Sequence, residues 1–158
     1  MNKFMKEAIA EATKGVFLGH GGPFGAVIVK QNKDGIKEIV GRGHNRVIKE
    51  NNPTRHGEMV AIADATKNLG TFDLTGCDIY TTGEPCPMCL GALMWANINN
   101  IFYGCTIEDN EKIGFRDNKF NDIMSIKRKT FYNMYQIERD ACLELFDMYN
   151  KINNKKSY

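Results

Sequence analysis

Two short stretches, His56-Gly57-Glu58 and Pro85-Cys86-Pro87-Met88-Cys89, govern the interpretation of this chain. Together they offer one imidazole and two thiolates, which are ligand types that zinc prefers. Three protein ligands leave a fourth position for water, as in catalytic zinc sites. We therefore predict a catalytic zinc site held by His56, Cys86 and Cys89.

The flanking residues place these ligands at the starts of two helices. Apolar residues recur at helical spacing over 57–69, and Pro87 opens a short apolar helix over 87–96. At a helix N-terminus the macrodipole and the free N–H groups stabilise thiolates. Glu58, two residues after the histidine, is placed to move a proton between zinc-bound water and a substrate nitrogen.

Two other interpretations of these residues stay open. Cys86 and Cys89 could form a redox pair, although the upstream His-x-Glu and the three preceding predicted strands do not suit one. A closed structural zinc site would need a fourth ligand. The remaining candidates show no paired spacing; they are His20, His44, Cys77, Cys105 and Cys142. We expect His20 and His44 to make local hydrogen bonds.

Length and composition limit the class of protein. The chain has 158 residues, of which 42% are hydrophobic and 25% charged, enough for one domain with a core. A net charge of +2 argues against nucleic acid as a partner. The longest apolar stretch, 90–96, is far shorter than the roughly 20 residues of a membrane helix. Charges in the N-terminal residues and an odd count of 5 cysteines predict a cytoplasmic protein with neither signal peptide nor disulfide framework.

The hydrophobic pattern predicts strands that alternate with helices. Such alternation indicates an α/β layered domain around a four- or five-stranded sheet. Residues 105–120 are expected to form a charged loop, and 120–128 are ambiguous. The predicted helices are 3–18, 57–69, 87–96 and 139–152, and the predicted strands are 26–30, 38–43, 77–81, 100–103 and 131–138.

The two zinc motifs also carry a resemblance to a known family. His-x-Glu followed by Pro-Cys-x-x-Cys is the signature of zinc-dependent base deaminases. Over nearly its whole length the chain resembles the cytidine deaminase superfamily, and within it the bacterial guanine deaminases. It departs from their pattern at Gly57, where alanine is usual, and at Arg116, where an acidic residue is common. The segments that carry the resemblance are 21–29, 52–58, 84–92, 114–117 and 155–158.

The resemblance implies a three-layer α/β/α fold around a mixed five-stranded sheet, formed by one domain over 1–158. It also implies one zinc ion per chain, held by His56, Cys86 and Cys89, with a bound water as the nucleophile. Glu58 would be the proton shuttle. Loss of this group should cost roughly 10²–10⁴-fold or more in rate.

Other residues acquire roles through the resemblance alone. Phe24 would stack on a purine and Asn45 would hydrogen-bond it. Asp117, placed in the predicted loop, would take part in proton transfer or amine recognition. The resemblance further implies a homodimer that exchanges its C-terminal segment, about 130–158, so that Tyr158 reaches the neighbouring chain's pocket.

The resulting hypothesis is hydrolytic deamination of guanine to xanthine and ammonia. One alternative is a deaminase of another free base or nucleoside, such as guanosine, cytosine or cytidine. A tRNA adenosine deaminase is a second, against which the small net charge and the aromatic end of the tail both argue. A zinc-stabilised binding module is a third, but it would leave Glu58 without a purpose.

Overall fold

A mixed five-stranded sheet forms the centre of the protein in a computed structural model that describes residues 1–125, 132–156 and 158. The strand order is β2-β1-β3-β4-β5. β1 is antiparallel to both β2 and β3, whereas β3, β4 and β5 run parallel. The strands are β1 Gly25–Gln31, β2 Lys37–His44, β3 Cys77–Gly83, β4 Asn100–Cys105 and β5 Met134–Gln136.

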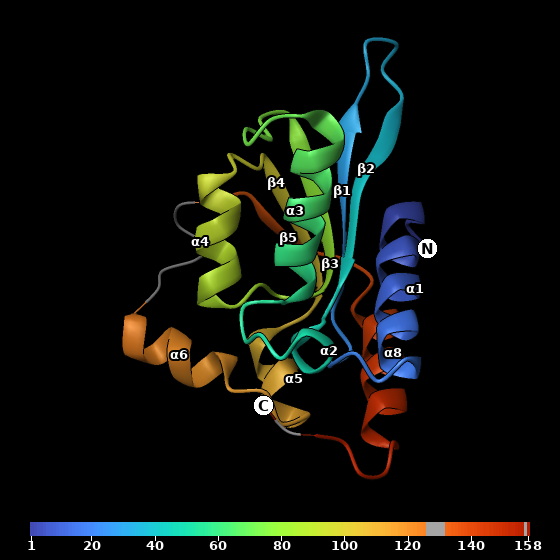
Figure 1. The fold of residues 1–158 in the computed structure, drawn as a ribbon, viewed down its shortest axis with the longest axis vertical. Helices are drawn as coiled ribbons and strands as arrows, with labels where there is room; N and C mark the ends of the chain where they lie inside the picture. The colour runs from blue at the N-terminus through green and yellow to red at the C-terminus, as the bar shows by residue number, and fades with distance from the viewer. Residues whose placement is uncertain (126–131, 157) are drawn as a thin grey trace.

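Helices cover both faces of the sheet, so the domain has three layers (Figure 1). Alternate residues of β1 point to opposite faces: Ala26 and Ile28 join one apolar cluster, and Val27 and Val29 join the other. Because both faces of β1 are buried over residues 25–29, this stretch is continuously apolar instead of alternating. One face packs on α1 Lys3–Phe17 and α8 Arg139–Asn150, and the other on α3 Gly57–Leu69 and α4 Pro87–Trp95.

Three short helices gather at one end of the sheet, near the C-terminus (Figure 1). They are α2 Val47–Glu50, α5 Ile107–Lys112 and α6 Asp117–Met124. The predicted charged loop over 105–120 was therefore wrong. Thr106 and Asp109 form a capping box that satisfies the first N–H groups of α5, and this compensates for its lack of an apolar stripe. Asp117 consequently begins a helix instead of lying in a loop.

Most other predicted elements agree with the structure to within a few residues. The helix predicted over 57–69 has the same bounds, and its N-cap is His56. The last predicted strand shortens to Met134–Gln136, and its first residue, 131, lies outside the described residues. So does the part of the ambiguous segment beyond 125. Among the described residues, no helix is long and apolar enough to cross a membrane.

Candidate active site

The three predicted zinc ligands meet at the N-termini of α3 and α4. His56 is the N-cap of α3, Cys86 is the N-cap of α4, and Cys89 lies in the first turn of α4. Their ligand atoms all lie within 4.8 Å of one another, and Cys86 Sγ is 3.6 Å from His56 Nδ1. Both cysteines are free of disulfides. This nitrogen and two sulfur atoms fit a tetrahedral zinc ion with one position left for solvent.

The electrostatics of the cluster favour a thiolate at Cys86. A hydrogen bond from Cys89 lowers the pKa of Cys86 to about 4, helped by His56 and opposed by burial. Burial alone would lower the pKa of His56, but the contact with Cys86 outweighs it and raises that pKa to about 9. The contact with Cys86 and burial both raise the pKa of Cys89. The protein chain thus favours a thiolate, the form of cysteine that binds a metal ion, at Cys86.

Glu58 lies in the first turn of α3, beside the cluster, with 5% of its surface exposed. Burial raises the pKa of its carboxyl to about 7, and the charge of Cys86 acts in the same direction. A carboxyl group with a pKa near neutrality can both accept and donate a proton at physiological pH. Among the residues around the cluster, Glu58 is therefore suited to general acid–base work.

The remaining predicted site residues line one small chamber beside the His56, Cys86 and Cys89 cluster. Glu58 and His56 line it together with Phe24, Asn45, Asp117 and Tyr158. A wider cleft of about 480 Å³ adjoins this chamber and shares His56, Asp117 and Tyr158 with it. The structure therefore brings together residues from five separate parts of the chain. Cys89 is fully buried behind the others.

Tyr158 closes one side of the chamber. The backbone N–H of Gly22 donates a 2.6 Å hydrogen bond to its hydroxyl oxygen. The Phe115 ring packs edge-on against both Tyr158 and Phe24, with ring centroids 5.6 and 4.7 Å apart. Burial raises the pKa of Tyr158, so its hydroxyl stays neutral. This aromatic wall lines the same chamber as His56 and Cys86. We call the three candidate zinc ligands, His56, Cys86 and Cys89, the donor cluster.

Asn45 and Asp117 are each held by neighbouring groups. The Asn45 backbone N–H donates to the Phe24 carbonyl at 2.8 Å, and its side-chain oxygen accepts from the Val47 N–H at 3.1 Å. Asn110 Nδ2 donates to Asp117 Oδ2 at 3.0 Å. Both side chains therefore have defined directions at the chamber wall.

Sequence reasoning missed Phe115 and Asn110 as residues of the chamber. Phe115 stands within the segment 114–117 that carried the family resemblance, which was a usable signal. Asn110 follows directly after the capping-box residue Asp109, so recognition of α5 would have placed it on a helix beside the site.

The two departures from the family pattern both lie at this site. A Cβ on Gly57 would stand 2.9 Å from the Phe24 carbonyl oxygen, so glycine allows the first turn of α3 to contact that backbone directly. Arg116 is the N-cap of α6, and its guanidinium lies 5.3 Å from the centre of the Phe120 ring. Its charge therefore borders the wider cleft.

A three-layer α/β/α domain with a His/Cys/Cys cluster and a buried glutamate defines the class of zinc-dependent base deaminases. Residues 1–105 match the cytidine and deoxycytidylate deaminase zinc-binding region, and the chain belongs to this family. The predicted superfamily, fold and class of zinc-dependent aminohydrolase are thus confirmed.

Individual relatives cover almost the whole chain. Guanine deaminase of Bacillus subtilis strain 168 is 41% identical over 156 residues, which make up 98% of this chain and 97% of that protein. The X-ray structure of guanine deaminase from Bacillus subtilis matches with a TM-score of 0.72 at 39% identity, covering 100% of this chain and 99% of that one. The tRNA-specific adenosine deaminase of Aquifex aeolicus strain VF5 is 33% identical, covering 96% of this chain and 95% of that protein.

Proposed function

We propose that this protein hydrolyses guanine to xanthine and ammonia. The observation that carries the proposal is the buried carboxyl of Glu58 beside the donor cluster, in a chamber that Tyr158 closes through Gly22. The chamber adjoins the cleft of about 480 Å³, a volume that suits a small-molecule ligand such as a free base. The similarity to a guanine deaminase over nearly the full length supports the same substrate.

His56, Cys86 and Cys89 would hold one zinc ion, whose chemical contribution is to lower the pKa of a coordinated water to about 7 and so supply the nucleophile. Glu58 would accept a proton from the attacking water and deliver it to the adjacent ring nitrogen of guanine. Glu58 would then take the second proton, from the hydroxyl added to the ring carbon, and pass it to the exocyclic amine, so that the C–N bond breaks and ammonia leaves. The near-neutral pKa of this buried carboxyl suits both transfers.

The opposite wall orients the base. Phe24 offers a ring for stacking, and Asn45 offers an amide for hydrogen bonding to the purine edge. Asp117 faces the chamber, where it takes part in proton transfer to the leaving amine or in its recognition. Its bond from Asn110 holds the carboxylate in place for that role.

The proposal includes a homodimer of single-domain chains, 1–158, that exchange their C-terminal segments from about residue 130. Within one chain, Tyr158 already contacts Gly22 and Phe115. After exchange, the same contacts would form between chains, so each pocket would be completed by its neighbour.

We also place the protein in the cytoplasm, in purine metabolism. All 5 cysteines are free thiols, which suits a reducing compartment. The free Cys86 and Cys89 are also what a metal site requires.

Ammonia release by the zinc-loaded protein tests the substrate. The panel is guanine, guanosine, adenine, adenosine, cytosine, cytidine and a tRNA with adenosine in its anticodon. We expect turnover of guanine and little of the others. Turnover of another base or nucleoside, with guanine inert, would overturn the substrate while keeping the chemistry. Turnover of the tRNA alone would favour the activity named for the Aquifex relative.

A further inference from the structure

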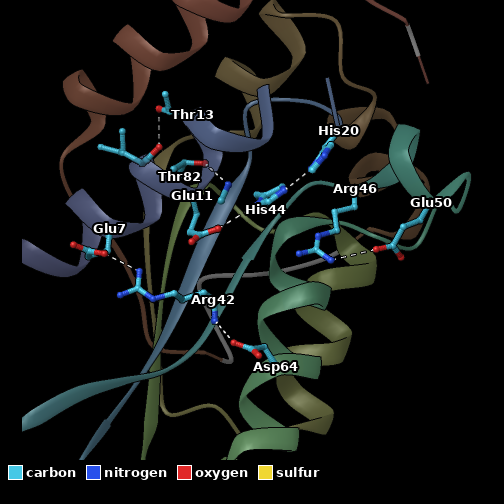
Figure 2. Close-up of polar contacts among 12 residues, drawn as sticks. Glu7, Glu11, Thr13, His20, Arg42, His44, Arg46, Glu50, Asp64 and Thr82 are labelled. Carbon is cyan, nitrogen blue, oxygen red and sulfur yellow. Dashed lines mark hydrogen bonds and ion pairs between the residues drawn. The ribbon is translucent and has the colours of Figure 1, made fainter. Parts of the chain in front are cut away.

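A hydrogen-bonded row of three side chains lies beside the pocket and is not used by the chemistry above. Glu11 of α1, His44 at the end of β2 and His20 follow one another in space (Figure 2). The Glu11 carboxylate is 3.1 Å from His44 Nδ1, and His44 Nε2 is 2.9 Å from His20 Nδ1. His44 is only 2% exposed, so these two contacts take the place of water around its ring.

Hydrogen-bond chemistry gives this row a direction. A carboxylate only accepts, so Nδ1 of His44 must carry a proton and donate it to Glu11. In neutral His44 the other nitrogen, Nε2, is then an acceptor, and Nδ1 of His20 donates to it. The carboxylate of Glu11 thereby determines which nitrogen of each histidine carries the proton.

The surrounding charges support this arrangement at neutral pH. The bond with His44 lowers the pKa of Glu11, so its carboxyl is ionised. Burial lowers the pKa of His20, and the positive charges of Lys49, Arg46 and Lys14 act in the same direction. His20 therefore stays neutral and able to donate from Nδ1.

The far end of the row holds the segment 20–24, which forms part of the pocket. The His20 carbonyl accepts hydrogen bonds from the N–H groups of Ile48 and Lys49 in α2, each at 3.1 Å. The next residue, Gly21, lies so close to Asn45 that a Cβ there would stand 2.0 Å from the Asn45 amide oxygen. Gly22 then donates to Tyr158. Displacement of His20 would therefore disturb both Asn45 and Tyr158.

We propose that Glu11, His44 and His20 form a positioning relay that fixes the segment 20–24 against Asn45 and Tyr158, and so sets the affinity of the pocket for its substrate. None of the three side chains lines the chamber, so they act through backbone contacts and not on the reacting atoms. The effect on substrate rests on the proposed function, whereas the effect on the segment does not.

The test is a double-mutant cycle that includes a matched control on the same helix. Glu7 lies one turn before Glu11 on α1 and pairs with Arg42 of β2 at 2.7 Å, away from the histidines (Figure 2). Glu11→Ala and His20→Ala should each raise KM for guanine about three- to tenfold, with kcat unchanged. This factor corresponds to the net contribution of one hydrogen bond to binding. Glu7→Ala should leave KM unchanged.

The combined variants show whether the row acts as one unit. Because both outer residues work through His44, Glu11→Ala with His20→Ala should raise KM no further than the more severe single variant. Glu7→Ala with His20→Ala should equal the product of the two single effects. Glu11→Gln keeps an oxygen that accepts from His44 Nδ1, so it should restore most of the affinity lost in Glu11→Ala.

Amide hydrogen exchange of residues 20–22 and 24 gives a readout independent of substrate, since Pro23 has no amide hydrogen. Exchange there should accelerate in Glu11→Ala and His20→Ala and stay unchanged in Glu7→Ala and Glu11→Gln. Unchanged exchange in both relay variants, or multiplicative KM effects of Glu11→Ala and His20→Ala, would overturn the relay. If the wild-type protein does not turn over guanine, the proposed substrate is wrong, and hydrogen exchange alone still decides the relay.

Discussion

The two sides of the chamber are built in different ways. The donor side comes from the first turns of α3 and α4, which share one face of the sheet and one apolar cluster. The opposite wall comes from Phe24, Asn45, Asp117 and Tyr158, which belong to distant parts of the chain and are joined by single hydrogen bonds and ring contacts. The core supports the donor side, whereas in the opposite wall Phe24 packs on a core cluster and Asp117 and Tyr158 depend on a few polar and ring contacts.

Because the two sides differ in this way, we expect substitutions in them to affect different kinetic constants. A change on the donor side removes groups needed in the transition state, so it should lower kcat. A change in the wall loosens substrate binding, so it should chiefly raise KM. The Glu58 and Tyr158 variants below test that division, and the predictions run from the largest effect to the smallest.

Glu58→Gln should lower kcat by about 10²–10⁴-fold or more, because the amide keeps the shape of the side chain but transfers no proton. Zinc content and unfolding temperature should stay close to those of the wild type. Ammonia release and elemental analysis of the same sample measure both properties. Glu144→Gln, at an exposed position of α8, is the control and should be fully active. Normal turnover by zinc-replete Glu58→Gln protein would contradict the assignment.

Tyr158→Ala should raise KM for guanine about tenfold, which corresponds to the loss of roughly one hydrogen bond and some ring contact. The effect on kcat should be small. Tyr135→Ala removes a half-exposed tyrosine of β5 that stacks on Phe102, and its KM should be unchanged.

Mixing variants also tests the exchange of C-terminal segments. Tyr158→Ala and Glu58→Gln chains, unfolded and refolded together, should recover activity at low guanine if each pocket receives its tyrosine from the neighbour. Each mixed dimer then contains one pocket with both wild-type residues. Activity equal to the sum of the two separate variants would contradict the exchange.

Asp109→Asn should destabilise the protein by about 1–2 kcal/mol at pH 7, a value reduced because Arg139 is partly exposed. The buried Asp109 carboxylate accepts two hydrogen bonds from Arg139, at 2.7 and 2.8 Å, and caps α5. The bond from Arg139 lowers the pKa of Asp109 far below that of a free aspartate. Asp122→Asn, at an exposed position of α6, should have little effect.

The sign of this effect depends on pH. A carboxyl with a lowered pKa in the folded state contributes its full stability above the unfolded pKa of about 3.9, and loses it as the pH falls further. The difference in the free energy of unfolding between wild type and Asp109→Asn should therefore shrink below about pH 4. Urea unfolding at pH 7 and at successively lower pH measures it. A gap that is constant across this range would show that the ion pair is not its source.

The donor side could be predicted from sequence because its determinants are local. His56, Glu58, Cys86 and Cys89 lie in two short motifs, and the apolar period of 57–69 gave the bounds of α3. α5 and α6 were missed because charged residues conceal any apolar period there. Thr106 and Asp109 already carried the capping signal that would have revealed α5.

The opposite wall could not be derived from local patterns. Phe24, Asn45, Asp117 and Tyr158 were selected through family resemblance, since nothing in their immediate neighbours distinguishes them from core or surface residues. Their meeting depends on how α1, β2 and the short helices pack in three dimensions. The relay of Glu11, His44 and His20 is hidden for the same reason, because its members come from separate elements.

The Phe24 carbonyl is the point where the two sides of the chamber touch. Its oxygen accepts from the Asn45 N–H and leaves no room for a Cβ on Gly57, while the ring of the same residue lines the chamber. In a close-packed interior, a push on one atom is passed to its neighbours. Under the proposed function, a base stacked on the Phe24 ring would press on the same residue whose carbonyl packs against the first turn of α3, which carries Glu58. Phe24 would thus couple substrate recognition to the position of Glu58. A ligand that fits the pocket poorly would then be converted more slowly as well as bound more weakly.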